Sequence, residues 1–198
     1  MRADNARTGS TRSDPAQDQS VGLLQDRRLV ARVLRHWTEM AMAQRLPRRA
    51  DIDPWMIGED WANCALLQVN WPLQQSIFVA VGENILPARD PSLAGALIAA
   101  CPSDTLLSVV LSHLSQVSSA RACLTIEGTA LHLGAMILYR AVLMPVSDNS
   151  VTLDHILAAV NYRELRAGEP RDLTTRLTWT HGLKRANGWS SEDLTLRD

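Results

Sequence analysis

The sequence predicts an α+β fold, with a five-stranded antiparallel sheet, short helices on one face of the sheet, and an amphipathic helix before it. Two observations on periodicity lead to this prediction. Apolar residues repeat at helical spacing near the N-terminus and again after residue 104, whereas strand-like runs bounded by turn residues occupy 64–81 and 123–162. A third is composition: 46% of the 198 residues are hydrophobic and 21% charged, as in one globular domain with polar ends.

The N-terminal region divides into two parts. Residues 1–22 are polar and hold little to bury, so we expect a disordered arm. Residues 23–46 are expected to form the amphipathic helix, because one apolar stripe recurs at i, i+3, i+4 and i+7. That stripe contains Val30, Val33, Leu34, Trp37, Met40 and Ala41. Pro47 ends the helix, and a loop follows to Pro54.

Two strands and two helices follow. Residues 64–69 and 77–81 are short apolar, β-branched runs, and Trp71-Pro72 between them predicts an antiparallel pair. The turn Asp90-Pro91-Ser92 predicts a short helix that ends at Cys101-Pro102. A longer helix is expected from Pro102-Ser103-Asp104 onward. Its buried stripe would contain Leu106, Val110, His113, Leu114 and Val117.

The second half of the chain is expected to supply three more strands. Residues 123–127 alternate, Gly128-Thr129 predicts a turn, and an apolar run leads from Ala130 to Pro145. Residues 155–162 also alternate, although a helix is a rival interpretation there. The domain is therefore expected to cover residues 47–165, followed by a C-terminal extension, 166–198. Trp179 and Trp189 in this extension suggest that it docks on an acidic surface of its own domain or of a second copy, and a disordered tail without a role is the alternative.

Composition excludes several classes of protein. The longest uncharged stretch, 62–82, is too polar to span a membrane, and residues 1–20 lack the apolar core of a secretory signal, so a cytoplasmic protein is expected. The three cysteines have no CxxC spacing and are expected to be small buried hydrophobes. The 19 Arg residues are scattered along the chain, which does not favour nucleic-acid binding.

No motif predicts catalysis. The chain lacks the GxSxG, GxxxxGK[ST] and GxGxxG signatures, and its histidines share no metal-ligand spacing. Asp51 and Asp53 could form a carboxylate pair for acid/base catalysis. On a loop bounded by prolines, however, carboxylates more often cap helices and form turns. We therefore expect no catalytic residues, no metal and no cofactor.

Four segments carry a resemblance to a known family. They are His36-Trp37 through to the loop 46–54, Phe78–Glu83, Tyr139–Asp148 and Asp154–Leu157. These residues resemble a family of small, stand-alone bacterial PAS-like proteins, and the likeness covers about Val30 to Leu165. The resemblance implies a five-stranded antiparallel sheet cupped over small helices. It also implies a sensory or interaction module in bacterial signalling that lacks an attached output domain.

The function expected is therefore a non-enzymatic module that binds a protein partner or forms a homodimer, with an optional small apolar ligand in the cup between sheet and helices. The ligand-binding residues expected are Val81, Val110, His113, Leu114, Met136 and Leu138. The partner-binding residues expected are Val30, Val33, Leu34, Trp37, Trp179 and Trp189. The resemblance implies an alternative, a haem sensor, because His113 lies where some haem-binding PAS domains carry the axial histidine. A small-molecule enzyme that uses the same cup is a further alternative. The helix stripe predicts the dimer contact, so removal of residues 1–46 is expected to leave a folded monomer.

Overall fold

The computed structural model of the chain describes residues 29–41, 45–52, 57–86, 93–169 and 174–180. A helix occupies 29–41, and two further helices are α3 (Leu106–Leu111) and α4 (Leu114–Ala120). The strands are β1 (Cys64–Gln68), β2 (Ile77–Val81), β3 (Cys123–His132), β4 (Ala135–Val146), β5 (His155–Glu164) and β6 (Arg176–Thr180). Four 3-10 turns are η1 (Arg49–Asp51), η2 (Gly58–Asn63), η3 (Leu73–Gln75) and η4 (Ile98–Ala100).

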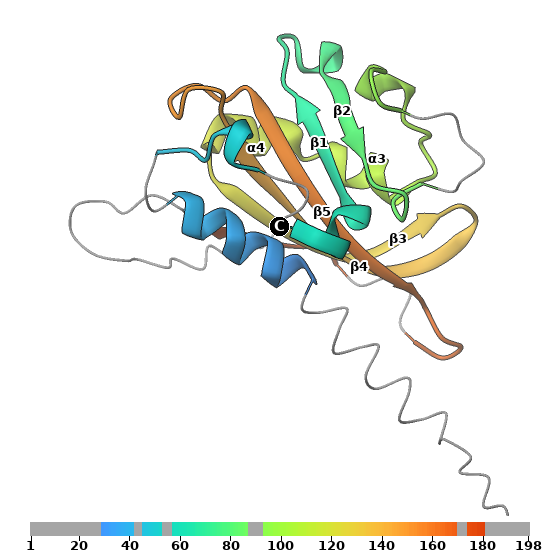
Figure 1. Cartoon of the computed structure of the whole chain (residues 1–198). Helices are drawn as coiled ribbons and strands as arrows, with labels where there is room; N and C mark the ends of the chain where they lie inside the picture. Colours follow the sequence, from blue (N-terminus) through green and yellow to red (C-terminus); the bar gives the residue numbers. More distant parts are fainter. Residues whose placement is uncertain (1–28, 42–44, 53–56, 87–92, 170–173, 181–198) are drawn as a thin grey trace, which may run out of the picture.

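The described strands form one antiparallel sheet in the order β2-β1-β5-β4-β3-β6 (Figure 1). The α+β class and the antiparallel sheet are confirmed, whereas the predicted count of five strands is wrong. The sixth strand, β6, lies within the C-terminal extension and pairs with β3 from Cys123↔Thr180 to Glu127↔Arg176. The extension thus docks on its own domain at residues 176–180, through main-chain pairing with an edge strand.

Helices cover both faces of the sheet (Figure 1). Because side chains alternate along a strand, each strand contributes to two separate cores. On β4, Tyr139, Ala141 and Leu143 face α3 and α4, whereas Val142, Met144 and Val146 face the helix 29–41. Central strands covered on both sides carry apolar residues at nearly every position, which hides the alternation from a reader of the sequence.

The stripe of the N-terminal helix packs on the chain's own sheet. Val30, Val33 and Trp37 are buried there, Leu34 packs partly buried against the same core, and the Trp37 indole Nε1 donates a hydrogen bond to the Pro145 carbonyl at 2.8 Å. The stripe is therefore covered without a second copy of the chain, and these four residues do not form the exposed contact surface that the sequence suggested. Removal of the helix would uncover one face of the sheet.

Three local expectations are wrong. Gly128 lies within β3 opposite Tyr139, and the turn comes later at Leu133-Gly134, both of which have positive φ. Residues 93–97 run beside β2 instead of forming a helix, and only the turn η4 follows them. The longer helix is broken into α3 and α4 at Ser112-His113.

A membrane span was sought among the described residues. No described helix has both the length and the apolar character that crossing a bilayer requires.

Candidate functional site

The six predicted ligand-binding residues do not surround one cavity. Val110 and Leu114 are buried in the core on the α3 and α4 side, and Val81 packs partly buried against the same core. Met136 and Leu138 precede Val142 on β4 by six and four residues. By strand alternation their side chains share the face of Val142, which is opposite to the α3 and α4 side. The cup that the sequence suggested is filled by the chain's own side chains on one side of the sheet.

His113 lies away from this core. It is half-buried at the break between α3 and α4, and its Nδ1 lies 3.1 Å from the Gln116 Oε1. His113 is the residue that precedes α4, and its ring contacts the side-chain amide of Gln116. It does not lie between the sheet and the helices. The geometry therefore does not favour His113 as an axial ligand of haem.

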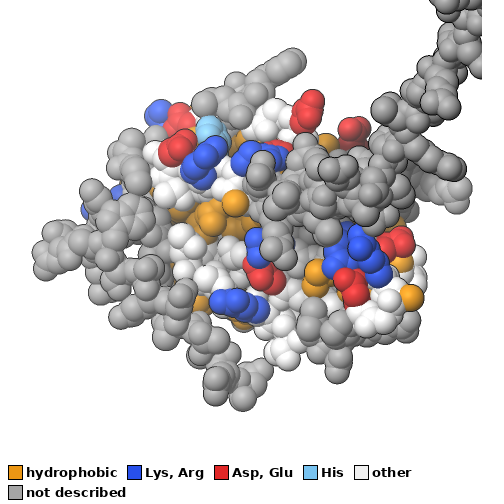
Figure 2. All heavy atoms as spheres, turned by 90° about the horizontal axis from the view of Figure 1, so that it is seen from below, with side chains coloured by type: hydrophobic (Ala, Val, Ile, Leu, Met, Phe, Trp, Pro, Cys, Tyr) orange, Lys and Arg blue, Asp and Glu red, His pale blue; other side chains and the backbone are white. Residues whose placement is uncertain are grey.

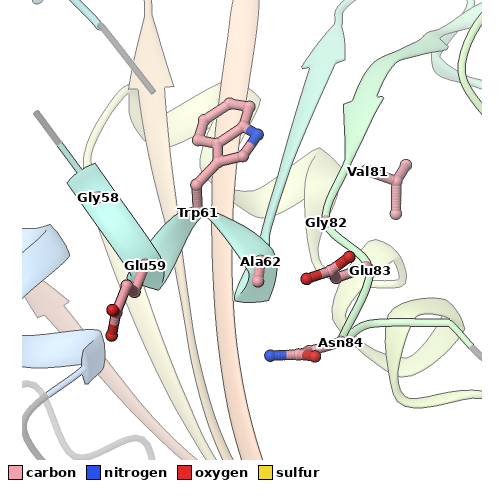
Figure 3. Close-up of a pocket in the computed structure, with 8 residues that line it drawn as sticks. All are labelled: Gly58, Glu59, Trp61, Ala62, Val81, Gly82, Glu83 and Asn84. Atoms are coloured by element: carbon pink, nitrogen blue, oxygen red, sulfur yellow. The ribbon is translucent and has the colours of Figure 1, made fainter. Parts of the chain in front are cut away.

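A pocket opens where η2 meets the end of β2 (Figure 3). Its volume is about 660 Å³, and it is lined by Gly58, Glu59, Trp61, Ala62, Val81, Gly82, Glu83 and Asn84. The Glu83 and Asn84 side chains extend toward Ala62 in Figure 3, and the Trp61 indole lies on the other side of η2. Val81 is the one predicted ligand-binding residue in this pocket.

Main-chain hydrogen bonds hold the two walls of the pocket together. Gly82 N–H donates to the Cys64 carbonyl at 2.7 Å, and Asn84 N–H donates to the Ala62 carbonyl at 2.8 Å. A Cβ atom on Gly82 would lie 2.3 Å from the Ala62 carbonyl oxygen, closer than any real contact. Glycine is therefore required here by close approach of two backbones. The sequence signal was the Gly82 that ends the second strand-like run.

The pocket is acidic. Glu59 and Glu83 both line it, and no described Lys, Arg or His side chain does. Asn84 adds an amide that can donate and accept hydrogen bonds. Such a lining attracts a cation or a hydrogen-bond donor, so an apolar ligand, as the sequence suggested for the cup, fits this pocket poorly.

An ion pair links one wall of the pocket to the N-terminal helix. Between Glu59 and Trp61, Asp60 accepts hydrogen bonds from Arg32 Nε at 2.7 Å and from Arg32 Nη2 at 2.5 Å. This hydrogen bonding raises the pKa of the Arg32 guanidinium. The paired geometry is bidentate, which fixes the orientation of both side chains as well as their separation. Neither Arg32 nor Asp60 was identified from the sequence.

The two buried thiols, Cys64 and Cys123, are not activated as nucleophiles. Burial raises the pKa of Cys64 to about 12 and that of Cys123 well above its ordinary value, so both are protonated at neutral pH. Both behave as the small buried hydrophobes that the sequence predicted, whereas Cys101 is half-buried.

His132, the last residue of β3, is a buried histidine to which the sequence analysis gave no role. It packs against the start of α3. The Leu106 N–H donates to His132 Nδ1 at 3.1 Å, and the His132 ring meets Tyr162 edge-on with centroids 4.8 Å apart. Burial lowers the pKa of His132, although Asp104 nearby raises it. His132 thus acts as a neutral acceptor that holds the first turn of α3.

The remaining predicted partner residues lie in the C-terminal extension. Trp179 on β6 packs partly buried against the core beside α3 and α4, so it serves the fold. Trp189 lies outside the described residues. In the part of the chain that the structure describes, no three His, Cys, Asp or Glu side chains gather as metal ligands.

Comparison of the chain with models of protein families, with curated proteins and with solved structures gave no match.

Proposed function

We propose that the chain is a non-enzymatic sensory and interaction module, PAS-like in its plan, in which the pocket beside η2 takes a small cationic ligand and the N-terminal helix carries the response. The observation behind this proposal is that η2 serves both sites. Glu59 and Trp61 line the pocket, and Asp60 between them binds Arg32 of the helix 29–41.

The ligand class follows from charge and shape. Two carboxylates and an amide around one opening favour a small amine or guanidinium, because such a cation replaces lost water contacts with charged acceptors. Trp61 also lines the pocket, but its indole lies on the other side of η2 from Glu83 and Asn84, so the ligand class rests on the carboxylates and the amide. A neutral apolar molecule would leave the carboxylates desolvated without a partner.

The response follows from the shared element. The helix is held mainly by its buried apolar stripe, with the Arg32–Asp60 pair at its edge. A ligand that fixes Glu59 also restricts its neighbour Asp60 and thereby the position of Arg32. The mechanism is a population shift between more and less firmly docked states of the helix, and it requires the ligand to bind one state more tightly.

The test uses the full chain with spermidine and tetramethylammonium as cationic probes and hexanol as an apolar probe. We expect a cationic probe to raise the melting temperature and to slow hydrogen exchange in residues 29–41. Glu83→Gln should abolish both effects, whereas Glu39→Gln, which changes an exposed helix carboxylate away from the pocket, should keep them. Binding of hexanol alone, or binding of cations that survives combined Glu59→Gln and Glu83→Gln changes, overturns the proposal.

A further inference from the structure

One end of the molecule is built from two chain segments that contain no charged residue. Residues 62–82 and 91–103 hold no Asp, Glu, Lys or Arg, although 21% of the chain is charged. The described parts of these segments lie side by side. Phe78 N–H donates to the Ala96 carbonyl at 2.9 Å, Gly95 N–H donates to the Phe78 carbonyl at 2.7 Å, and Ile77 bridges Leu97. We call this end the uncharged edge.

Figure 1 places the uncharged edge at one end of the molecule. The β1–β2 hairpin and η4 lie together at the top of Figure 1. Figure 2 views the molecule from below, and there Arg or Lys side chains lie beside Asp or Glu side chains on the surface. The face seen from below thus carries charged groups of both signs, whereas residues 62–82 and 91–103 carry none.

The uncharged edge exposes two large apolar side chains. Trp71 is 70% exposed and Leu97 is 48% exposed. Both adjoin the buried Ser76. Its Oγ accepts from the N–H of Asn70, the neighbour of Trp71, at 3.0 Å, and its carbonyl accepts from the N–H of Ile98, the neighbour of Leu97, at 2.9 Å. Trp71 and Leu97 therefore lie on two neighbouring segments at the same end of the molecule.

The loop that presents Trp71 is rigid before any partner arrives. Asn70 Nδ2 donates to the Gln75 carbonyl at 2.9 Å, and the Gln75 and Ser76 N–H groups donate to Pro72 and Leu73. This network holds the backbone on both sides of Trp71, so the loop adds little backbone ordering cost to binding. Exposed tryptophans on ordered supports are the side chains that dominate interface energies.

Charge decides which occupant fits. A partner that brought a charged group against these two segments would lose its hydration and find no opposite charge on either segment. A second copy brings the same uncharged surface, and a two-fold axis places each patch against itself. Because 93–98 already covers the outer side of β2, contact would be through side chains and not through added strand pairing. We propose that the uncharged edge is the contact surface of a symmetric homodimer centred on Trp71 and Leu97.

Sedimentation velocity of the full chain from about 1 to about 300 µM tests this proposal. We expect a reversible dimer whose dissociation constant rises at least about tenfold in Leu97→Asp and in Trp71→Ser. The matched control is Leu131→Asp, since Leu131 is 50% exposed but lies at the far end of β3. The dimer should survive this change. Circular dichroism confirms that each variant is folded.

Three outcomes overturn the proposal. The first is a wild-type chain that is monomeric at every concentration, which would leave this edge to a different protein. The second is a dimer that persists in both edge variants. The third is a dimer that Leu131→Asp weakens as much as the edge variants do.

Discussion

Gly82 shows how one residue sets the geometry of the pocket. Its Cα lies so close to the Ala62 and Trp61 carbonyls that a methyl group has no space, and the obstructing atoms are backbone. We predict that Gly82→Ala lowers the free energy of unfolding by roughly 2 to 3 kcal/mol, because two paired segments must separate. Urea denaturation measures the change.

A second glycine provides the control for Gly82. Gly95 has φ of +83°, but a Cβ there meets nothing within 4 Å. Gly95→Ala should therefore show only the cost of a left-handed alanine, about 1 kcal/mol. If Gly82→Ala were no more damaging than Gly95→Ala, the close approach would not be what requires glycine.

His132 makes stability depend on pH. Its pKa is lower in the folded chain than in the unfolded chain because burial disfavours the imidazolium. The unfolded state therefore binds the proton first as the pH falls. The stability that neutral His132 contributes is fully present above about pH 6.5 and is lost progressively below it. Protonation would also place a positive charge at the N-terminus of α3 and remove the acceptor of the Leu106 N–H.

We predict that His132→Leu lowers the free energy of unfolding by roughly 1 to 3 kcal/mol at pH 7, because it leaves a buried N–H without its acceptor. The difference from the wild type should narrow as the pH falls to about 5. Burial and Arg49 lower the pKa of His155, too, so some pH dependence remains in the variant. His113→Leu is the control and should change stability by less than about 1 kcal/mol. A difference that stays constant between pH 5 and 8 would contradict this role for His132.

Whole elements were predicted correctly where turn residues bound a strand-like run or where an apolar stripe recurs at helical spacing. β1, β2 and β5 fall in the predicted runs, and the helix 29–41 follows its stripe. β4 hides its faces because residues 141–146 are buried on both sides, so Met136 and Leu138 were assigned to the wrong core. Gly128 was read as a turn, whereas its missing side chain makes room for Tyr139 and Thr175.

The candidate site escaped sequence analysis for a different reason. Its walls come from η2 and from the end of β2, two segments that no local pattern connects. Of the predicted ligand-binding residues only Val81 lines this pocket, and it was predicted for an apolar ligand. The Arg32–Asp60 pair joins residues 28 positions apart, so its existence depends on how the helix crosses the sheet. Long-range packing of this kind leaves no periodic signal.

β6 was missed because it is five residues long in a polar surrounding, although its alternation is regular. Leu177 and Trp179 face the core, and Thr178 between them faces the other side. We predict that Trp179→Ala increases the rate of tryptic cleavage at Arg176 by about tenfold or more, because the strand loses its main buried contact. Thr178→Ala, which keeps that contact, should leave the rate nearly unchanged. Equal acceleration by both changes would show that main-chain pairing alone protects the strand.

At the scale of the whole molecule, the two cores share one sheet. Every central strand contributes alternate side chains to both cores. Loss of packing in one core therefore disturbs the strands on which the other core packs. We therefore predict a single cooperative unfolding transition of the full chain in urea, with tryptophan fluorescence and far-ultraviolet circular dichroism coinciding. Trp37 lies in one core and Trp179 beside the other, which lets fluorescence report on both.

One variant in each core separates shared from independent unfolding. Leu107→Ala removes buried apolar volume beneath α3, and Val33→Ala does so beneath the N-terminal helix. We expect Leu107→Ala to lower the free energy of unfolding by roughly 2 to 5 kcal/mol and Val33→Ala by less, because valine loses fewer carbon atoms. Each change should move the whole transition and raise hydrogen exchange in both helical layers. A separate early transition confined to residues 29–41 in Val33→Ala would mean that this helix docks on a sheet that is stable without it.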